Sequence, residues 1–520
     1  MLADTLQSWF NHLLLPQVLL PFVLIVICFW LLSGTKVDPR EPPEIKSAIP
    51  VVGHIINLVR NGLSYYTKLS FDNPNLPIFT INIPGVKSYV IASPALMSAA
   101  QRNSRNISFD PFLDVAASRI AGCSPATCHA LLEKRRGGLG VNQLIVEAMH
   151  PALLGEGLDG MNETMVKGLK LWIDGLPDSG QTAFNLYEWC KDAMTVASTD
   201  SVWGQLNPFK DKFIRDCFWD FEGGIGKLIP KVAPHIVARQ AWKGREALTS
   251  AFLCYFKADG LKNASMLAHA RYNVCSANNI SLEEFARIEA SLGLGLLSNT
   301  VPTSFWLMYD LYSRPTLLEQ LREEIQSNAL YIDGQSATID VADLRDQCPL
   351  LVSAFQESMR FRASGASTRF VYEDMMFDNK YLLRAGSIVY IPVKPMHSHP
   401  EVWSQTSSEF VPHRYLKSNP RKLGGFLGFG VSPSICPGRH FASAEIIAFA
   451  AAMILRFDLS PATSSSAWVE PQLNLSSVVA SATPPGEPFM VKLGIRDEYK
   501  DYDWDFRVTK GKGQFALVIG

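Results

Sequence analysis

The 520-residue sequence predicts a mainly α-helical fold with small β-sheets (α+β), preceded by one N-terminal transmembrane helix. Three features predict this class. They are an uncharged apolar run near the N-terminus, a long and largely apolar helix in the middle of the chain, and a glycine-rich loop around Cys436 that leads into a second apolar helix. Because 47% of the residues are hydrophobic, the chain can build a large core.

Charge and cysteine content restrict the class of protein further. The formal net charge is −1, whereas a nucleic-acid-binding protein needs a strongly basic face, so we expect no nucleic-acid partner. The nine cysteines are scattered and odd in number, which is typical of reduced thiols in a protein that faces the cytosol.

The N-terminus carries the membrane signal. Residues 13–32 contain no charge, and about 20 apolar residues are enough to cross a bilayer as a helix. A cleaved signal peptide is the alternative, but no Lys or Arg precedes the run. Lys36 and Arg40 follow it, which places the rest of the chain on the cytosolic side. We therefore predict a membrane anchor over 1–35 and a stiff, proline-rich linker over 36–53.

The remaining chain is predicted to be helical with a few strands. The runs PIFTINI and SYVIAS flank Pro84-Gly85 and predict a small hairpin. Residues 140–330 are typical of helices joined by polar loops, and 369–393 alternate as strands do. The run Met396–His399 has no metal-binding pattern and is interpreted as a loop.

The long apolar helix begins at a capping box, Ser281–Glu284. Pro302 lies inside it and has no N–H, so the carbonyl of Ser298 loses its helical partner and the turn opens. Asn299 and Thr300 lie in that turn. A proline kink can be purely structural, but polar residues at the kink of a buried helix favour a functional site.

A second helix, around 349–362, carries Glu357 and Arg360 on one face. Such a pair is commonly an exposed surface contact, so by itself it is weak support for a site.

The glycine-rich loop from Gly424 to Arg439 suits a thiolate ligand. The start of the following helix would supply partial positive charge and free amides beside the sulfur of Cys436. Glycines let the backbone approach a flat cofactor, and Phe429 can pack beside it and limit water access. A structural buried cysteine is the alternative. Zinc is disfavoured because no second cysteine lies near Cys436.

Together these segments resemble the cytochrome P450 family in order and spacing, over nearly the whole chain to about residue 495. Three motifs carry the resemblance: the haem-binding signature at Phe429, Gly430, Cys436 and Gly438, the E-x-x-R pair at Glu357 and Arg360, and an F-x-P-x-R-F-like segment at Phe410, Pro412, Arg414 and Tyr415.

The resemblance implies the cofactor and its binding residues. The cofactor is haem b, with Cys436 as the iron ligand and Phe429, Gly430 and Gly438 in contact with the haem. Glu357, Arg360 and Arg414 form a buried charge network, and Arg369 binds a propionate. It also makes 54–520 a haem-thiolate catalytic domain, and places the single-pass protein in the endoplasmic reticulum membrane. Two departures concern the propionates: Ser432 and Ser434 stand where glycine and a basic residue are usual, and no W-x-x-x-R motif is present.

The distal side departs from the family as well. An acid followed by threonine is common there, whereas this chain has Ser298 and Asn299, with Thr300 next. Residues 298–306 are similar to the sterol 7α-hydroxylase and prostacyclin synthase branch. We expect Asn299 and Thr300 to act in catalysis by ordering a water molecule.

The activity expected from the resemblance is monooxygenation of a lipophilic small molecule, namely a terpenoid, a sterol-like molecule or a polyketide, in specialised metabolite biosynthesis. Residues that could line its pocket are Phe109, Phe112, 363–368 and 479–483. Because the missing acid also fits enzymes that rearrange a peroxide, a redox-independent isomerase or dehydratase is an alternative. A non-enzymatic haem or lipid binder is another.

The chain has no flavin or nicotinamide motif, so a monooxygenase would need an NADPH-cytochrome reductase as electron donor. Lys417, Arg421, Lys422 and Arg439 flank the cysteine loop and could form its docking patch. An ordinary solvated charge cluster is the alternative.

Overall fold

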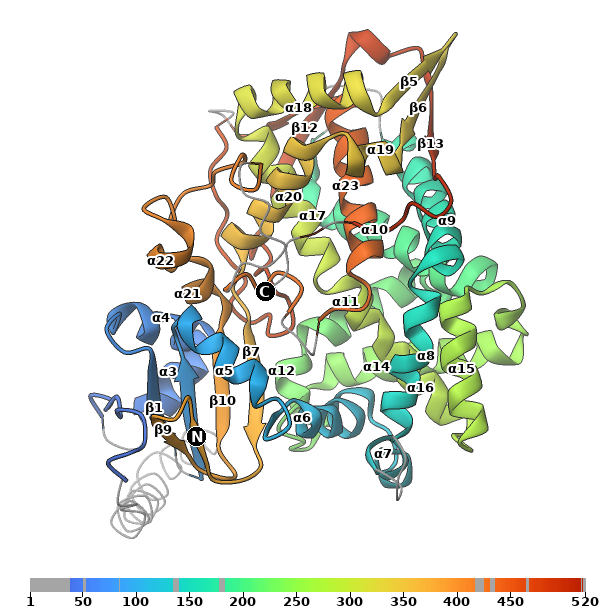
Figure 1. The fold of residues 1–520 in the computed structure, drawn as a ribbon. Coiled ribbons are helices and arrows are strands. Elements are labelled where there is room, and N and C mark those ends of the chain that lie inside the picture. The colour runs from blue at the N-terminus through green and yellow to red at the C-terminus, as the bar shows by residue number, and fades with distance from the viewer. Residues whose placement is uncertain are drawn as a thin grey trace, which may run out of the picture.

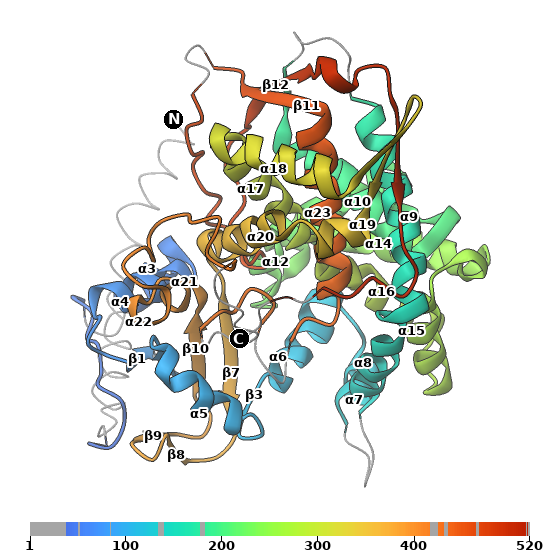
Figure 2. The same cartoon turned by 45° about the horizontal axis from the view of Figure 1, so that its top comes forward.

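The structure is a computed structural model in which a large helical region lies beside a smaller β-sheet region (Figures 1 and 2). It describes residues 38–49, 53–83, 85–133, 140–176, 183–416, 425–430, 435–463, 467–515 and 517. No helix within these ranges is long and apolar enough to cross a membrane. The predicted span 13–32 lies outside the described residues, and so does the anchor of which it is part.

Helices make up most of the described chain, which confirms the mainly α class. They are α3 (Gly53–Asn61), α4 (Ser64–Asp72), α5 (Met97–Arg102), α6 (Asp110–Val115), α7 (Pro125–Leu132), α8 (Val141–Ala152), α9 (Gly155–Asp174), α10 (Leu186–Trp203), α11 (Lys212–Gly223), α12 (Ile225–Leu228), α13 (Pro234–Val237), α14 (Arg239–Lys257), α15 (Met266–Ala277), α16 (Leu282–Leu297), α17 (Thr300–Tyr312), α18 (Pro315–Asn328), α19 (Val341–Asp346), α20 (Pro349–Arg362), α21 (Val393–His397), α22 (Pro400–Trp403) and α23 (Arg439–Arg456).

The largest sheet has five strands in the order β1-β2-β10-β7-β3. The strands are β1 (Ile78–Ile83), β2 (Val86–Ile91), β3 (Ile107–Ser108), β7 (Ala366–Val371) and β10 (Ile388–Pro392). The predicted hairpin is confirmed, because β1 and β2 pair antiparallel. Since β3 pairs with β7, the segment after residue 108 is brought beside Arg369.

Three smaller sheets complete the β structure of the described residues. They join β11 (Phe457–Pro461) to β12 (Met490–Ile495) and β4 (Ala183–Asn185), β13 (Asp503–Arg507) to β6 (Ser336–Asp340) and β5 (Leu330–Asp333), and β8 (Met375–Phe377) to β9 (Tyr381–Leu383). The sheet with β13 belongs to a C-terminal tail that extends beyond the region of family resemblance. The tail then reaches the start of α23, where the Phe515 N–H donates to His440 Nδ1 at 2.9 Å.

The described part of the predicted linker packs against the five-stranded sheet. The Ile45 N–H donates to the Thr80 carbonyl at 3.0 Å. Glu41 is buried, and its carboxylate accepts hydrogen bonds from Lys87 Nζ at 2.6 Å and from the Tyr89 hydroxyl at 3.0 Å. Residues 38–49 are therefore held on β1 and β2 by specific polar contacts.

The central apolar segment forms two helices, α16 and α17, instead of one bent helix. The break falls at Ser298 and Asn299, one turn before Pro302, as expected for a carbonyl that has lost its N–H partner. The hydroxyls of Thr300, Thr303 and Ser304 each donate to the carbonyl four residues earlier, a pattern that bends helices. Every residue of α17 is buried.

The predicted loop at Met396–His399 is wrong in part. Met396 and His397 belong to the short helix α21, and His399 precedes α22, which begins at Pro400. The side chains of Met396 and His397 are both 0% exposed. Their packing in the core explains why this polar segment is helical instead of forming a loop.

Candidate active site

The backbone around Cys436 doubles back on itself. The Cys436 N–H donates to the Phe429 carbonyl at 2.8 Å, and Gly428 and Gly430 form a β-bridge. Gly430 has a φ of +80°, which favours glycine. Gly438, two residues after the cysteine, is the N-cap residue of α23. The loop thus presents the sulfur at the N-terminus of a long, buried helix.

Opposing influences act on the Cys436 thiol. Burial raises its pKa, while the Gly438 amide and the positive charge of Arg439 lower it. Arg439 folds back toward the loop, and its Nη1 donates to the Cys436 carbonyl at 3.2 Å. A metal cation on the sulfur would supply the further positive charge that a buried thiolate needs.

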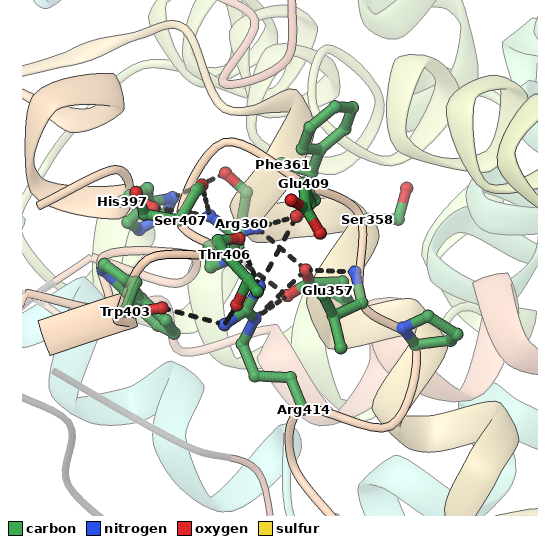
Figure 3. Close-up of polar contacts among 12 residues, drawn as sticks. Glu357, Ser358, Arg360, Phe361, His397, Trp403, Thr406, Ser407, Glu409 and Arg414 are labelled. Atoms are coloured by element: carbon green, nitrogen blue, oxygen red, sulfur yellow. Dashed lines mark hydrogen bonds and ion pairs between the residues drawn. The ribbon is translucent and has the colours of Figure 1, made fainter. Parts of the chain in front are cut away.

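A buried charge network lies on α20 and the loop after α22 (Figure 3). Glu357, which is 0% exposed, pairs with Arg360 at 2.8 Å and with Arg414 at 3.0 Å. It also accepts the Val411 N–H at 2.8 Å. The three residues that the resemblance placed in one network are therefore brought together.

Arg360 uses its remaining donors to fix the surrounding backbone. Its guanidinium donates to the carbonyls of His397 at 2.6 Å, Ser407 at 2.7 Å and Glu409 at 2.7 Å. Arg414 binds the Trp403 carbonyl at 3.1 Å in the same way. Because a buried charge without partners is costly, these contacts hold the whole 397–414 segment against α20.

His397 connects this network to the cysteine loop, and sequence reasoning missed it. Burial lowers the pKa of His397 to about 3, so the ring is neutral. Its Nε2 accepts the Leu427 N–H at 2.7 Å, so Nδ1 carries the proton and donates to the Arg360 carbonyl at 3.1 Å. The ring also stacks on Phe426. No spacing in the sequence signals this contact.

The helix break at Asn299 meets two of the segments predicted to line a pocket. Asn299 is exposed, and its Oδ1 accepts the Ser481 N–H at 2.7 Å. The Ser364 N–H donates to the Ser481 carbonyl at 2.8 Å. The Thr300 hydroxyl donates to Leu296 within its own helix at 2.7 Å, so Asn299 rather than Thr300 projects from the break.

Arg369 lies on β7, in the sheet next to these segments. Its Nη1 donates to Ser367 Oγ at 2.8 Å and to the Thr368 carbonyl at 2.7 Å, and the guanidinium lies over the ring of Phe109. Burial lowers its pKa, and no carboxylate of the described residues pairs with it. A partly buried cation of this kind suits an anionic group of a cofactor.

Several predicted residues lie outside the described ranges: Ser432 and Ser434 of the signature, and Lys417, Arg421 and Lys422 of the expected docking patch.

The fold and the site together place the chain in the class of haem-thiolate proteins. The family model for cytochrome P450 matches residues 282–487. Over 97% of its length the chain is 38% identical to the cytochrome P450 monooxygenase nodJ of Hypoxylon pulicicidum, all of which is covered. The chain therefore belongs to the cytochrome P450 monooxygenase family.

Two more distant relatives extend the comparison. A cytochrome P450 monooxygenase of Gibberella zeae is 27% identical over 82% of each chain. The 25-hydroxycholesterol 7-alpha-hydroxylase of Rattus norvegicus is 27% identical over 59% of this chain and 79% of its own length. The resemblance to sterol hydroxylases that residues 298–306 indicated is thus present across a large part of the chain.

The residues present fit haem. Cys436 would offer the sulfur ligand, and Arg369 would offer a cation to a propionate. An added β-carbon at Gly438 would meet no described atom within 4 Å, so none of the described residues requires glycine there. A flat group packed against the sulfur would require it.

The role of Arg369 leads to a first prediction. We expect Arg369→Leu to release haem about 10- to 100-fold faster, because a hydrogen bond to a charged group contributes about 1.5–3 kcal/mol. Transfer of haem to an excess of a haem-scavenging protein measures the rate. Arg102→Leu, which removes an exposed arginine paired with Asp378, is the control. Equal release from both variants would contradict the assignment.

Proposed function

We propose that this enzyme inserts one oxygen atom of O2 into a C–H bond of a bulky lipophilic molecule, terpenoid or sterol-like, as a step of specialised metabolism. The balanced reaction is R–H + O2 + 2 e− + 2 H+ → R–OH + H2O. Haem bound through a cysteine thiolate supplies the oxygen activation, because the thiolate pushes electron density that favours O–O cleavage. The electrons come from an NADPH-cytochrome reductase.

The observation that carries this proposal is the meeting of two segments of small residues, 363–364 and 481–483, at the break between α16 and α17. Ala363 bridges to Ala482, and the Trp306 indole N–H donates to the Thr483 carbonyl at 2.8 Å. Beside Arg369 lies an aromatic surface, where Phe109 and Phe112 stack on each other with ring centroids 5.6 Å apart. Such surfaces bind a lipophilic molecule mainly by burying its apolar area.

The chain's own residues have separate tasks in this proposal. The Glu357 network and His397 hold the cysteine loop in place. Arg369 orients the cofactor. Asn299 projects from the helix break. Its Oδ1 accepts the Ser481 N–H, and its amide nitrogen, which has no hydrogen-bond partner among the described residues, orders a water molecule. The relatives support oxidation chemistry, since their names include monooxygenases and a sterol hydroxylase.

The experiment is a screen for substrate-induced shifts of the haem spectrum with terpenoid, sterol and polyketide sets, followed by turnover of the compounds that bind. Oxygenated product that depends on NADPH and the reductase supports the proposal. Product formed without NADPH and without the reductase would favour the alternative, an isomerase acting on a peroxide. This alternative is tested because Ser298 and Asn299 stand in place of the usual acid and alcohol. Haem binding without turnover would favour a binding protein.

The proposed role of Asn299 gives a second prediction. We expect Asn299→Leu to raise peroxide release relative to product, because leucine cannot order water at the break. Peroxide and product are measured in the same reaction with a substrate from the screen. Asn328→Leu, at the exposed end of α18, is the control. An unchanged ratio in Asn299→Leu would rule this role out.

We also propose that residues 13–32 anchor the protein in the endoplasmic reticulum membrane, with the catalytic domain on the cytosolic side. The sequence carries this proposal. Three exposed apolar side chains around α13 are compatible with contact to a lipid surface: Val232, Ile236 and Val237, which are 65%, 70% and 57% exposed.

A further inference from the structure

A carboxyl group from outside the α16–α17 segment lies next to its break. Glu222 is the penultimate residue of α11, and it lines a cavity of about 280 Å3 formed by α10, α11 and residues 474–488. The ring of Phe218, one turn earlier on α11, lies against Gly293 of α16, and Tyr187, which lines the cavity, packs edge-on against Phe305 of α17, so the cavity lies beside the break. The hydroxyl of Ser298, the first residue of the break, lowers the pKa of the Glu222 carboxyl. Sequence comparison with the family's acid–alcohol pair cannot find this acid, because it comes from another helix.

The cavity contains polar groups that lack partners in the protein. Within the described residues, Trp219 Nε1 and Ser477 Oγ are buried without a hydrogen bond, and both residues line the cavity. Ser298 Oγ, at 0% exposure of its residue, also makes no direct hydrogen bond. Because buried polar groups are nearly always satisfied, these groups indicate bound water. A liquid-like water occupies about 30 Å3, so the cavity has room for several.

The charges around Glu222 adjust its protonation. Burial raises its pKa to about 7, while Lys191 and Ser298 lower it. The ammonium group of Lys191 lies over the rings of Tyr187 and Trp219 and donates to Glu188 at 2.8 Å. The other charged groups that line the cavity are Glu188 and Glu487. Tyr187 stays neutral, because burial raises its phenol pKa well above the usual value.

We propose that this cavity holds a chain of water molecules through which Glu222 delivers protons, by way of Ser298, to the oxygen-binding side of the helix break. Glu222 thus replaces the acid that the α16–α17 segment lacks. It is a positioning and proton-supplying residue that acts through Ser298 and water, without itself touching substrate or cofactor. This proposal rests on the proposed oxygen chemistry, because only that reaction consumes protons at the break.

The number of protons consumed per O2 defines what Glu222 must supply. Without substrate, O2 takes either two electrons and two protons to give H2O2, or four electrons and four protons to give two H2O. The electrons in both cases come from NADPH through the reductase. Because the water-forming outcome needs more protons at the buried site, a failing supply favours release of peroxide.

The first test measures the carboxyl group itself. Infrared spectra of the haem-loaded protein are recorded from pH 5 to pH 9, and the Glu222→Gln spectra are subtracted. The protonated carboxyl band in the difference should disappear as pH rises, with a midpoint near 7, because the acid is neutral below its pKa. Glu445, whose pKa burial raises to about 8, contributes equally to both proteins and cancels. A difference spectrum without this transition overturns the proposal.

The second test measures proton supply during turnover with NADPH and reductase. In the wild type, the ratio of water to peroxide should fall as pH rises through 7. In Glu222→Gln it should be about tenfold lower at pH 6, equivalent to about 1.4 kcal/mol, and nearly independent of pH. Glu222→Asp should restore the pH dependence, which a purely structural role would not do. Asp216→Asn, an exposed carboxylate on the same helix, should behave as the wild type.

Lys191→Met provides a second test of the relay that does not depend on haem binding by Glu222→Gln. Removing the positive charge in Lys191→Met should move both midpoints to higher pH, because Lys191 lowers the Glu222 pKa. The proton relay is overturned if the pH midpoints of the infrared band and of the water-to-peroxide ratio do not move in Lys191→Met. It is also overturned if Glu222→Gln keeps its thiolate spectrum and shows an unchanged water-to-peroxide ratio. Neither result would contradict the proposed function. A wild-type protein that consumes no oxygen would instead contradict the proposed function.

Discussion

Replacing Cys436 with serine should abolish monooxygenase turnover and remove the thiolate-type band from the spectrum of the reduced protein with carbon monoxide. The serine hydroxyl has nearly the shape of the thiol, so the backbone hydrogen bond from residue 436 to the Phe429 carbonyl can persist. A neutral hydroxyl, however, cannot push electron density onto iron as a thiolate does. The expected loss is therefore chemical, and the fold should survive.

The matched control is Cys254→Ser. Cys254 is an exposed free cysteine on α14, far along the chain from the cysteine loop. Its replacement should leave haem content, the carbon monoxide band and turnover unchanged. A thiolate band that persists in Cys436→Ser would show that another cysteine binds the iron and would overturn the assignment of the ligand.

Features that depend on neighbouring residues could be predicted from the sequence. The hairpin around 84–85 and the break near Pro302 depend on backbone rules that act within a few residues. Ser281 caps α16 as predicted, with its Oγ accepting the Glu284 N–H at 3.3 Å. The capping box is nevertheless incomplete, because the Glu284 carboxylate binds the Ser124 N–H at 3.0 Å instead of returning to Ser281. A tertiary contact of Glu284 thus replaces the local hydrogen bond that the capping box predicts.

Contacts between distant residues could not be predicted in this way. The link from His397 to the cysteine loop joins residues 30 positions apart, and its ring is recognisable as structural only through its burial. A second buried network around Asp310 was missed as well. It joins α17 to α20 through Arg362 at 2.6 Å and Ser358 at 2.8 Å. None of these contacts between elements has a spacing that a helix or strand period would reveal.

The distal acid illustrates the same limit for function. The sequence correctly indicates that residues 298–300 lack the family's acid. It does not indicate that the end of α11, which carries Glu222, lies near the break, because α11 and α16 are brought together only by tertiary packing, with Phe218 against Gly293. Absence of a residue from its usual helix is therefore weak support for a change of reaction, since another element can supply the same chemical group.

The Glu357 network should be the most sensitive point for stability. We expect Arg360→Met to lower the free energy of unfolding by about 3–5 kcal/mol, because the buried Glu357 carboxylate loses one of its two cationic partners and keeps only Arg414. Glu357 is 0% exposed, and Arg360 is 1% exposed at its side chain, so solvent cannot compensate. The substitution also leaves the carbonyls of His397, Ser407 and Glu409 without their donor. Urea unfolding at constant pH measures the change.

Two further variants separate charge from geometry. Arg360→Lys keeps the positive charge but loses the planar fork, so its cost should fall between that of the wild type and that of Arg360→Met. Asp216→Asn breaks an ion pair whose side chains are 68% and 60% exposed, and should cost less than about 1 kcal/mol. If Arg360→Met cost no more than Asp216→Asn, the network would not stabilise the protein. Because the Arg360 guanidinium donates to the His397 carbonyl, and the His397 ring accepts the Leu427 N–H, Arg360→Met should also release haem faster, and Asp216→Asn should not.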